Sequence, residues 1–386
     1  MYDADDIVEQ KNRIKRRKRR LKFMVFLMIA AIAGGLYYYR DEWLPKLQGL
    51  GKQYQTIKND GRLAEGNFPI EINGGADYQL QYSSDTVFLL SDAYIYYYNT
   101  DGGQLKRRQH AYTNPVLNVA NGNALIYESG GGELTVENED SVLYKKSFDD
   151  TIVFARLSSD GYTAVVTTSE NYACRLIVYD DDGSAIYERN CVERINDVSF
   201  TKDSTGCVIS YIGAENGSLA TSVQRISFTS KDAKWTSPAV DTLGMETFDC
   251  DEGAFVLGYT ACAFIDSNGQ ISSYYKYDGD FAGGDCKGGG AAVIINDDDR
   301  RKYTLALFVG GGTSPVLVDF DEPLKYVTVY DGLAYVMDKN GISAYDFSGV
   351  LRSTAEISDS YDEFRRSEDY IFLMGYNRVD RIDYNS

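Results

Sequence analysis

The chain has 386 residues, 44% hydrophobic and 13% aromatic with only 6 prolines, and this composition excludes a mostly disordered protein. Residues 1–40 carry 10 Lys and Arg against 4 Asp and Glu, whereas the remainder carries 29 against 53. So acidic a remainder repels nucleic acid, and we predict no nucleic-acid partner. The single histidine, His110, excludes most Ser-His-Asp catalytic sites and multi-histidine metal sites.

A basic tail at residues 1–22 precedes an apolar run at residues 23–39. The tail includes Arg16, Arg17, Lys18, Arg19 and Arg20. As a helix, the uncharged run spans roughly 26 Å, which is at the lower limit for crossing a bilayer. Because basic residues are costly to translocate, the pattern predicts a single-pass signal-anchor helix in the cell membrane, with a cytoplasmic N-terminus and an extracellular C-terminal domain.

The same segment allows a second interpretation. Ala31-Ile32-Ala33 resembles a signal-peptidase site, whose cleavage would release a soluble protein. The long basic tail and the apolar run that continues past Ala33 favour a retained anchor. Residues 40–66 are then predicted to be a stalk or linker.

Residues 67–386 show a rhythm of short strands and Gly-containing turns that is typical of an all-β protein. The clearest unit, residues 326–356, contains four strands joined by three tight turns. Units of this kind recur about every 35 to 45 residues, which favours a β-propeller. They begin near Tyr78, Val116, Ile152, Asn196, Leu243, Phe281, Lys325 and Tyr361.

The last of these eight units supplies only three strands, while a lone strand at residues 68–72 precedes the first unit. We predict that this strand joins the last unit and closes the ring. Pro69 fits an edge strand, because proline cannot donate to a central ladder. Seven blades and a pair of β-sandwiches remain as alternatives, although sandwiches do not explain the three-plus-one arrangement.

Two short motifs carry a family resemblance. His110-Ala-Tyr-Thr-Asn-Pro115 and Leu125-Ile-Tyr-Glu-Ser-Gly-Gly131 resemble the domain of unknown function 5711 family. The basic tail, the anchor and the Phe68-Pro-Ile segment are similar too, so the likeness covers nearly the whole chain. The resemblance implies a membrane-anchored propeller of Gram-positive bacteria, with no established activity to carry over.

His110, Tyr112 and Asn114 are candidate ligand-binding residues, since together they could line a pocket. A histidine at the corner between a strand and a loop also often hydrogen-bonds to the backbone. The acidic runs at residues 180–183 and 296–299 do not alternate as calcium loops do, and they fit hairpin turns. We predict no catalytic residue, metal or cofactor.

Six cysteines lie between Cys174 and Cys286, and none forms a C-x-x-C motif. A two-residue turn at Asp182-Gly183 places Cys174 opposite Cys191 across a hairpin, which makes them a candidate disulfide. Two reduced thiols are the alternative, because the compartment decides whether the bond forms. Cys207, Cys250, Cys262 and Cys286 offer three pairings that the sequence does not rank.

Two classes of function fit this chain. In the first, the propeller is a binding or scaffold module at the cell surface, with a protein or cell-wall glycan partner. In the second, it is a glycan hydrolase or lyase with carboxylates in the central channel. The acids lie mainly in Asp-Gly turns, which favours binding, whereas a carboxylate pair deep in the channel would favour catalysis.

Overall fold

The computed structural model describes residues 57–59, 67–72, 78–215, 217–250, 253–310 and 314–384. The chain divides into two units, residues 1–55 and residues 56–386, and the described residues all belong to the second unit. Among them, no helix has the length and hydropathy needed to cross a bilayer. The predicted basic tail and membrane span, residues 1–39, lie outside the described residues.

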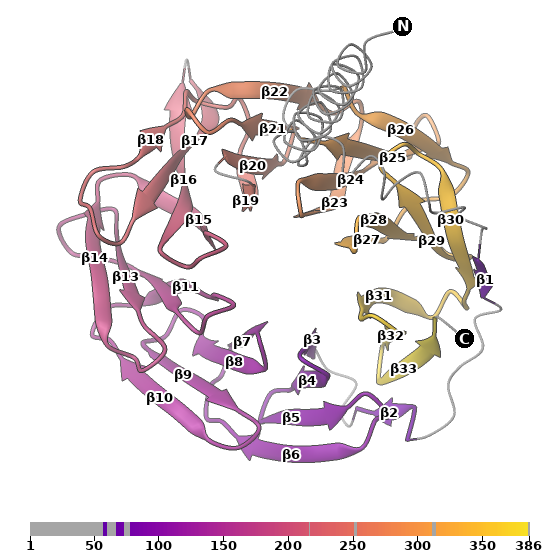
Figure 1. Cartoon of the computed structure of the whole chain (residues 1–386), viewed down its shortest axis with the longest axis horizontal. Helices are drawn as coiled ribbons and strands as arrows, with labels where there is room; N and C mark the ends of the chain where they lie inside the picture. Colours follow the sequence, from indigo (N-terminus) through magenta and orange to yellow (C-terminus); the bar gives the residue numbers. More distant parts are fainter. Residues whose placement is uncertain are drawn as a thin grey trace, which may run out of the picture. The chain divides into compact units, whose positions relative to one another are not determined.

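All but one of the described strands form eight antiparallel four-stranded sheets that follow one another around a ring (Figure 1). We call these sheets blades 1 to 8 and label the four strands of each blade A to D from the inside outward. Blade 1 contains β3 (Gln79–Ser83), β4 (Thr86–Leu90), β5 (Tyr94–Asn99) and β6 (Gln104–Gln109). Blade 2 contains β7 (Pro115–Ala120), β8 (Asn123–Glu128), β9 (Glu133–Asn138) and β10 (Val142–Ser147). Blade 3 contains β11 (Ile152–Leu157), β12 (Thr163–Thr167), β13 (Cys174–Tyr179) and β14 (Ala185–Cys191).

The remaining blades repeat this order. Blade 4 contains β15 (Arg194–Phe200), β16 (Gly206–Glu215), β17 (Ser218–Ser227) and β18 (Trp235–Thr236). Blade 5 contains β19 (Gly244–Cys250), β20 (Gly253–Gly258), β21 (Ala261–Ile265) and β22 (Ile271–Lys276), and blade 6 contains β23 (Asp280–Lys287), β24 (Gly290–Asp297), β25 (Lys302–Val309) and β26 (Val316–Phe320). Blade 7 contains β27 (Tyr326–Tyr330), β28 (Leu333–Met337), β29 (Gly341–Asp346) and β30 (Leu351–Glu356), and blade 8 contains β31 (Tyr361–Arg366), β32 (Tyr370–Gly375), β33 (Arg378–Asp383) and β2 (Ile70–Glu71).

The N-terminal strand β2 closes the ring as strand D of blade 8. It pairs antiparallel with β33, where Ile70 lies opposite Val379, and the Ile72 N–H donates to the Asn377 carbonyl at 2.8 Å. Ile70 is buried in an apolar cluster that also contains Phe372 of blade 8 and Leu80 of blade 1. The predicted eight blades and the three-plus-one closure are confirmed, and the seven-blade and β-sandwich alternatives are wrong.

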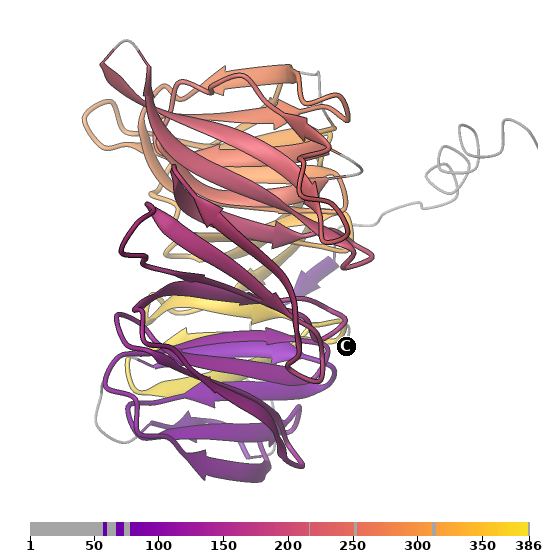
Figure 2. The same cartoon turned by 90° about the vertical axis from the view of Figure 1, so that its left-hand side faces the viewer.

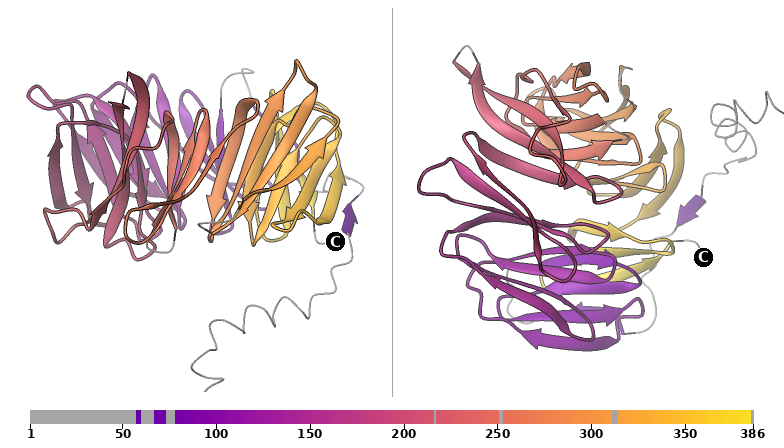
Figure 3. Two further views of the ribbon diagram at one scale, coloured as in Figure 1. Left: turned by 90° about the horizontal axis from the view of Figure 1, so that it is seen from above. Right: turned by 60° about the vertical axis from the view of Figure 1, so that its left-hand side comes forward.

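A further strand, β1 (Ile57–Asn59), lies within the residues expected to form the stalk, and no sequence pattern predicted it. It runs parallel to β30 at the outer edge of blade 7, with Ile57 opposite Ser353. The strands of each blade run between two faces of the ring, which Figure 3 shows edge-on. One face carries the A–B and C–D turns and is called the AB/CD face. The other carries the B–C turns and the D–A connections and is called the BC/DA face. Because β1 runs parallel to the D strand β30, which begins after a C–D turn, β1 begins at the AB/CD face.

The core lies between the blades, because each sheet packs one face on the preceding blade and the other on the next. The middle strands B and C are therefore apolar on both faces, as in β20, where every residue is buried. Strand D borders solvent, and five of the six residues of β6 are exposed. Polar outer strands of this kind discourage pairing with other chains.

The inner edge of strand A in each blade has no neighbouring strand, so its backbone N–H and C=O groups lack partners within the sheet. Side chains of the neighbouring blade supply the partners. Gln79 and Gln81 of β3 use their amide nitrogens to donate to the Pro115 and Leu117 carbonyls of β7, both at 2.8 Å. Their amide oxygens accept from Leu117 N (2.9 Å) and Val119 N (3.0 Å). The otherwise unpaired edge groups of β7 are thereby satisfied.

Similar inner-strand connections occur farther around the ring. Leu157 N donates to Asn118 Oδ1 at 2.8 Å, Thr247 N to Asp197 Oδ2 at 2.9 Å, Val329 N to Asp285 Oδ2 at 2.7 Å, and Arg365 Nε to the Leu80 carbonyl at 2.8 Å. Arg156 Nη2 lies 2.8 Å from Asp197 Oδ1, and Arg365 Nη1 donates to the Tyr326 hydroxyl at 2.9 Å. Within the described residues, these contacts connect the A strands at seven of the eight junctions.

Removal of β2 tests the closure. We expect a chain that starts at residue 73 to unfold at a lower temperature than one that starts at residue 67. Its free energy of unfolding should be smaller by about 3 kcal/mol or more. Phe68, Ile70 and Ile72 all contribute to the apolar cluster between blades 8 and 1, and each buried side chain of this size contributes about 1.5 to 3 kcal/mol. Thermal denaturation of the two truncations and the full chain measures the difference. Equal midpoints for the two truncations would contradict the closure.

Candidate functional site

His110 and Tyr112 lie together in a cavity of about 510 Å³ between blades 1 and 2. Their rings are stacked, with centroids 5.7 Å apart and planes 22° apart. His110 Nε2 is 2.9 Å from the Ser91 carbonyl, and because a carbonyl only accepts, Nε2 carries the proton. His110 Nδ1 is buried and has no hydrogen-bond partner among the described residues.

Asn114 lies outside this cavity. Its backbone N–H and that of Thr113 donate to the two carboxylate oxygens of Glu128, at 3.0 and 2.8 Å. These bonds fix the connection between β6 and β7, which in turn positions Tyr112 so that its hydroxyl lies 2.8 Å from Thr135 Oγ1. The structure therefore brings two of the three candidate residues together, and their role in ligand binding stays a prediction.

Arg108 is a member of this cavity that sequence reasoning missed. Arg108 lies on the outer strand β6, but its guanidinium reaches into blade 2 and lies 3.2 Å from Glu137 Oε1. Glu137 also accepts the Tyr97 hydroxyl at 2.7 Å, and burial raises the pKa of Tyr97 well above its usual range. With Glu133 and Lys145 also lining it, the cavity combines both charges with stacked rings, which suits a polar ligand.

A second cavity, of about 740 Å³, lies among the A strands of blades 5 to 8 and is lined by Glu246, Asp285 and Glu363. Asp285 Oδ2 accepts from Thr328 Oγ1 and Val329 N, and Glu363 accepts from Arg365. These two carboxylates are therefore used in hydrogen bonds within the fold. Glu246 accepts no hydrogen bond from the described residues.

The surroundings of Glu246 disfavour its charge. Glu246 is exposed to solvent on the inner side of the ring, but the surrounding protein displaces part of the water around its carboxylate, and this desolvation raises its pKa. The nearby carboxylates of Asp197 and Asp285 raise the pKa further, against the opposing effect of Arg156. Within the described residues, no group of three His, Cys, Asp or Glu side chains is placed to hold a metal ion.

The two acidic runs serve as turns. Asp180 Oδ1 accepts the Ser184 N–H at 2.6 Å across a hairpin in which Gly183 has a φ of 79°, a conformation that favours glycine. Asp297 Oδ1 accepts the Arg300 N–H at 2.9 Å in the next such run. Both carboxylates therefore stabilise the backbone of the turns.

The turn at Gly183 differs from the prediction, yet Cys174 still lies opposite Cys191. Asp180 pairs with Ser184, so the loop has three residues and the register near it is shifted by one position. A β-bulge next to Tyr179 reverses the shift farther along the hairpin. Both cysteines are buried thiols in this structure, and the hydrogen bond between them lowers the pKa of Cys174. The disulfide itself stays a prediction.

Oxidation tests this pair. We expect a disulfide between Cys174 and Cys191 to stabilise the protein by about 3 kcal/mol, because it closes a loop of about 15 residues in the unfolded chain. The measurement compares the midpoint of thermal unfolding with and without reductant, in the wild type and in Cys191→Ser. An effect of reductant that is as large in the variant as in the wild type would contradict the bond.

Exposed apolar side chains gather on the BC/DA face of three consecutive blades. They are Val153 and Tyr172 of blade 3, Val192 at the connection to blade 4, Leu219 of blade 4, and Met245 and Tyr259 of blade 5. Val153 and Met245 occupy β-bulges at the start of strand A, which takes them out of the inward-facing pattern. The long hairpin β16–β17 projects beside them (Figure 2). Most other exposed apolar residues are spread over the outermost strands.

The pKa of Glu246 predicts a pH effect on stability. A folded-state pKa above the unfolded value means that protons bind the folded state more tightly, so the ionised side chain destabilises the fold. This penalty is absent below the unfolded pKa and complete above the folded pKa. Glu246→Gln should therefore unfold at a higher temperature than the wild type at pH 8, with a gain that disappears near pH 4. Thermal unfolding across this range, with exposed Glu170→Gln as control, measures the effect. A gain that is independent of pH would contradict it.

The sequence model of a family of unknown function, DUF5711, matches residues 64–383. Among solved structures, the fold is similar to BamB from Moraxella catarrhalis, with 10% identity, a TM-score of 0.55, and coverage of 84% of this chain and 99% of that chain. The computationally designed protein Ika8 has 10% identity, a TM-score of 0.62 and coverage of 86% and 99%. Sqt1 from Saccharomyces cerevisiae has 7% identity, a TM-score of 0.56 and coverage of 86% and 100%. No curated protein matches the sequence. At these identities the likeness concerns the fold alone.

Proposed function

The chain belongs to this DUF5711 family, and we propose that it is a membrane-anchored extracytoplasmic propeller that binds a protein partner at the surface of a Gram-positive cell. The basic tail at residues 1–22 and the apolar run at residues 23–39 support the anchor. The first residue of β1, Ile57, lies at the AB/CD end of the outer strand β30.

The group of exposed apolar residues on the BC/DA face carries the proposal. Tyr172, Val192 and Tyr259 expose their side chains on an otherwise acidic domain. Single exposed apolar residues are normal on a protein surface, whereas a group of them on one face is typical of an interaction site. Aromatic side chains are enriched at the centre of protein interfaces, where charged residues are depleted. The projecting hairpin β16–β17 supplies a further exposed edge beside them.

A glycan hydrolase or lyase is the second candidate, and one observation favours it. Glu246 has a raised pKa in the cavity among the A strands, as a general acid requires. Its neighbours Asp285 and Asp197 are both used in inner-strand connections, so neither is free to act as the second carboxylate. Loss of a glycan-cleaving activity in Glu246→Gln, with folding retained, would support this candidate.

Crosslinking on intact cells with a membrane-impermeant reagent tests the binding proposal. Replacing Tyr172, Val192 and Tyr259 together by Ser should weaken capture of the protein partner by about tenfold or more, since each interface residue of this kind contributes on the order of 1 kcal/mol. The control replaces three other exposed residues by Ser: Leu105 and Leu143 on outer strands, and Val350 in the turn before β30.

The outcomes separate the alternatives. Equal capture by the two triple variants would contradict a role for the BC/DA face. Capture of a glycan in place of a protein would point to the cavity that contains His110. Protection of the domain from the external reagent would contradict the extracytoplasmic location.

A further inference from the structure

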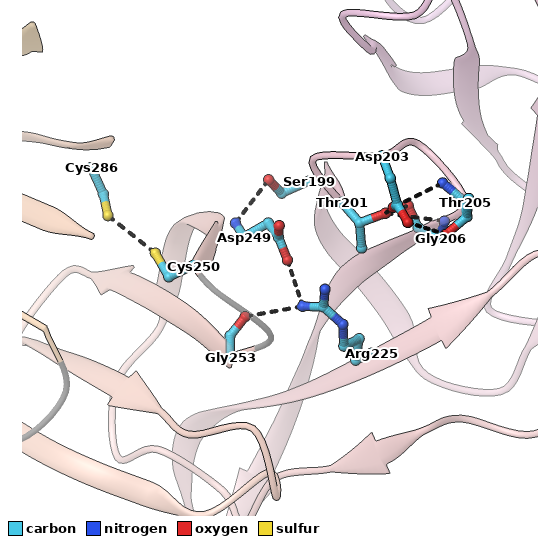
Figure 4. A network of polar contacts seen from close by, with 10 residues as sticks. All are labelled: Ser199, Thr201, Asp203, Thr205, Gly206, Arg225, Asp249, Cys250, Gly253 and Cys286. Carbon is cyan, nitrogen blue, oxygen red and sulfur yellow. Dashed lines mark hydrogen bonds and ion pairs between the residues drawn. The ribbon is translucent and has the colours of Figure 1, made fainter. Parts of the chain in front are cut away.

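The junction between blades 5 and 6 differs from the other seven. Here β19 faces β23, and the only polar contact between these two strands in the described part of the chain joins Cys250 Sγ to Cys286 Sγ, 3.4 Å apart (Figure 4). Gly283 and Gly284 occupy the middle of β23 and have no side chains to reach the neighbouring backbone. Two sulfurs thus take the place that amides, carboxylates and guanidinium groups occupy elsewhere around the ring.

The register of the two strands explains why the sulfurs meet. Cys250 pairs with Gly253 at the end of its hairpin, while in blade 6 the equivalent pair is Lys287 and Gly290. Cys286 is therefore one position farther from the turn than Cys250. Because successive side chains of a strand point to opposite faces, this offset directs one cysteine forward toward blade 6 and the other back toward blade 5.

Each cysteine is held in place by the residue before it. Asp249 N donates to Ser199 Oγ of blade 4 at 3.1 Å, and the Asp249 carboxylate binds Arg225 of the same blade at 2.5 Å. Asp285 accepts from Thr328 and Val329 of blade 7. Asp249 therefore connects its strand to blade 4, as Figure 4 shows, and Asp285 connects its strand to blade 7. The two sulfurs meet between backbones that are each fixed by the adjacent blade.

We propose that Cys250 and Cys286 are oxidised to a disulfide that joins blades 5 and 6. A disulfide has an S–S distance of about 2.05 Å, so the sulfurs approach by about 1.3 Å from their present 3.4 Å. Both S–H bonds break and one S–S bond forms between the two cysteines. The two electrons and the two protons pass to the disulfide of a thiol–disulfide oxidant, which becomes a dithiol. Cys250 is partly exposed and is the thiol that the oxidant meets first.

The proximity of Cys250 and Cys286 favours one of the three pairings that the sequence did not rank. Cys286 is 7% exposed, and Cys262, in the same apolar cluster, is 1% exposed. Cys207 is 0% exposed and packs between blades 3 and 4. Neither Cys207 nor Cys262 forms a hydrogen bond with another cysteine among the described residues, so each serves as a control.

The test uses the purified full chain, incubated with oxidised glutathione, alkylated without reduction and digested. Trypsin together with a glutamate-specific protease cleaves after Glu252 and separates Cys250 from Cys262. We expect a linked peptide that joins Cys250 to Cys286 in the wild type and in Cys262→Ser. In Cys286→Ser we expect an unlinked Cys250.

A second measurement separates the bond from its effect on the fold. In a Cys191→Ser background, which removes the pair in blade 3, reductant should lower the unfolding midpoint by several degrees, and it should not do so when Cys250→Ser is added. Alkylation of both Cys250 and Cys286 after oxidation would overturn the proposal, as would a link from Cys286 to Cys262. The peptide map of the wild type decides the matter even if a variant fails to fold.

Discussion

The pairing of β2 with β33 is the interaction on which the rest of the structure depends. A propeller blade buries both faces of its sheet only if a blade stands on each side of it, so an open ring leaves two apolar faces in water. Ile70 lies in the cluster that seals blade 8 against blade 1, and it comes from the opposite end of the chain to Val379, its partner. Closure is thus a contact of high sequence separation that becomes favourable only after the intervening blades have formed.

Around the inside of the ring, a second constraint acts on every blade. Strand A has an edge without a strand partner, and unsatisfied backbone groups are costly where little water reaches them. The chain meets this requirement with a different residue at nearly every junction, for example Gln81, Asn118, Asp197 and Arg365. The geometry of the edge is repeated at these junctions, but the side chains that satisfy it differ from one junction to the next.

Much of the architecture follows from the sequence because strand length, turn residues and alternation are local properties. The eight units and the closing strand with Pro69 were predicted on that basis. The inner-strand connections were not, because Gln79 and Gln81 look like ordinary solvent-facing residues until the next blade is in place. Arg108 was not singled out for the same reason, since its strand is mostly polar and exposed. The three residues of β1 are too few and too polar to be recognised as a strand.

The candidate sites divide in the same way. His110 and Tyr112 are two residues apart, so their proximity could be anticipated, whereas Asn114 lies past the turn that Glu128 fixes. The pairing of Cys174 with Cys191 was predicted from a two-residue turn, and the turn has three residues instead. A β-bulge farther along the hairpin compensates for the extra residue, so the two cysteines still lie opposite each other. Glu246 could not be singled out, since its environment comes from blades 3, 4 and 6. The sequence shows two Asp-Cys pairs, at residues 249–250 and 285–286, but only the arrangement of the blades shows that the two cysteines lie close together.

The parallel pairing of β1 with β30 has a mechanical consequence. A pull on the chain before Ile57, directed away from the AB/CD face, acts along the axis of β1 and loads its three residue pairs at the same time, in shear. Peeling would break them one by one, at lower force. Because β1 precedes β2 in the chain and lies on a different blade, such a load reaches the closing strand only after β1 has slipped. The short outer strand therefore shields the ring from tension applied through the N-terminus.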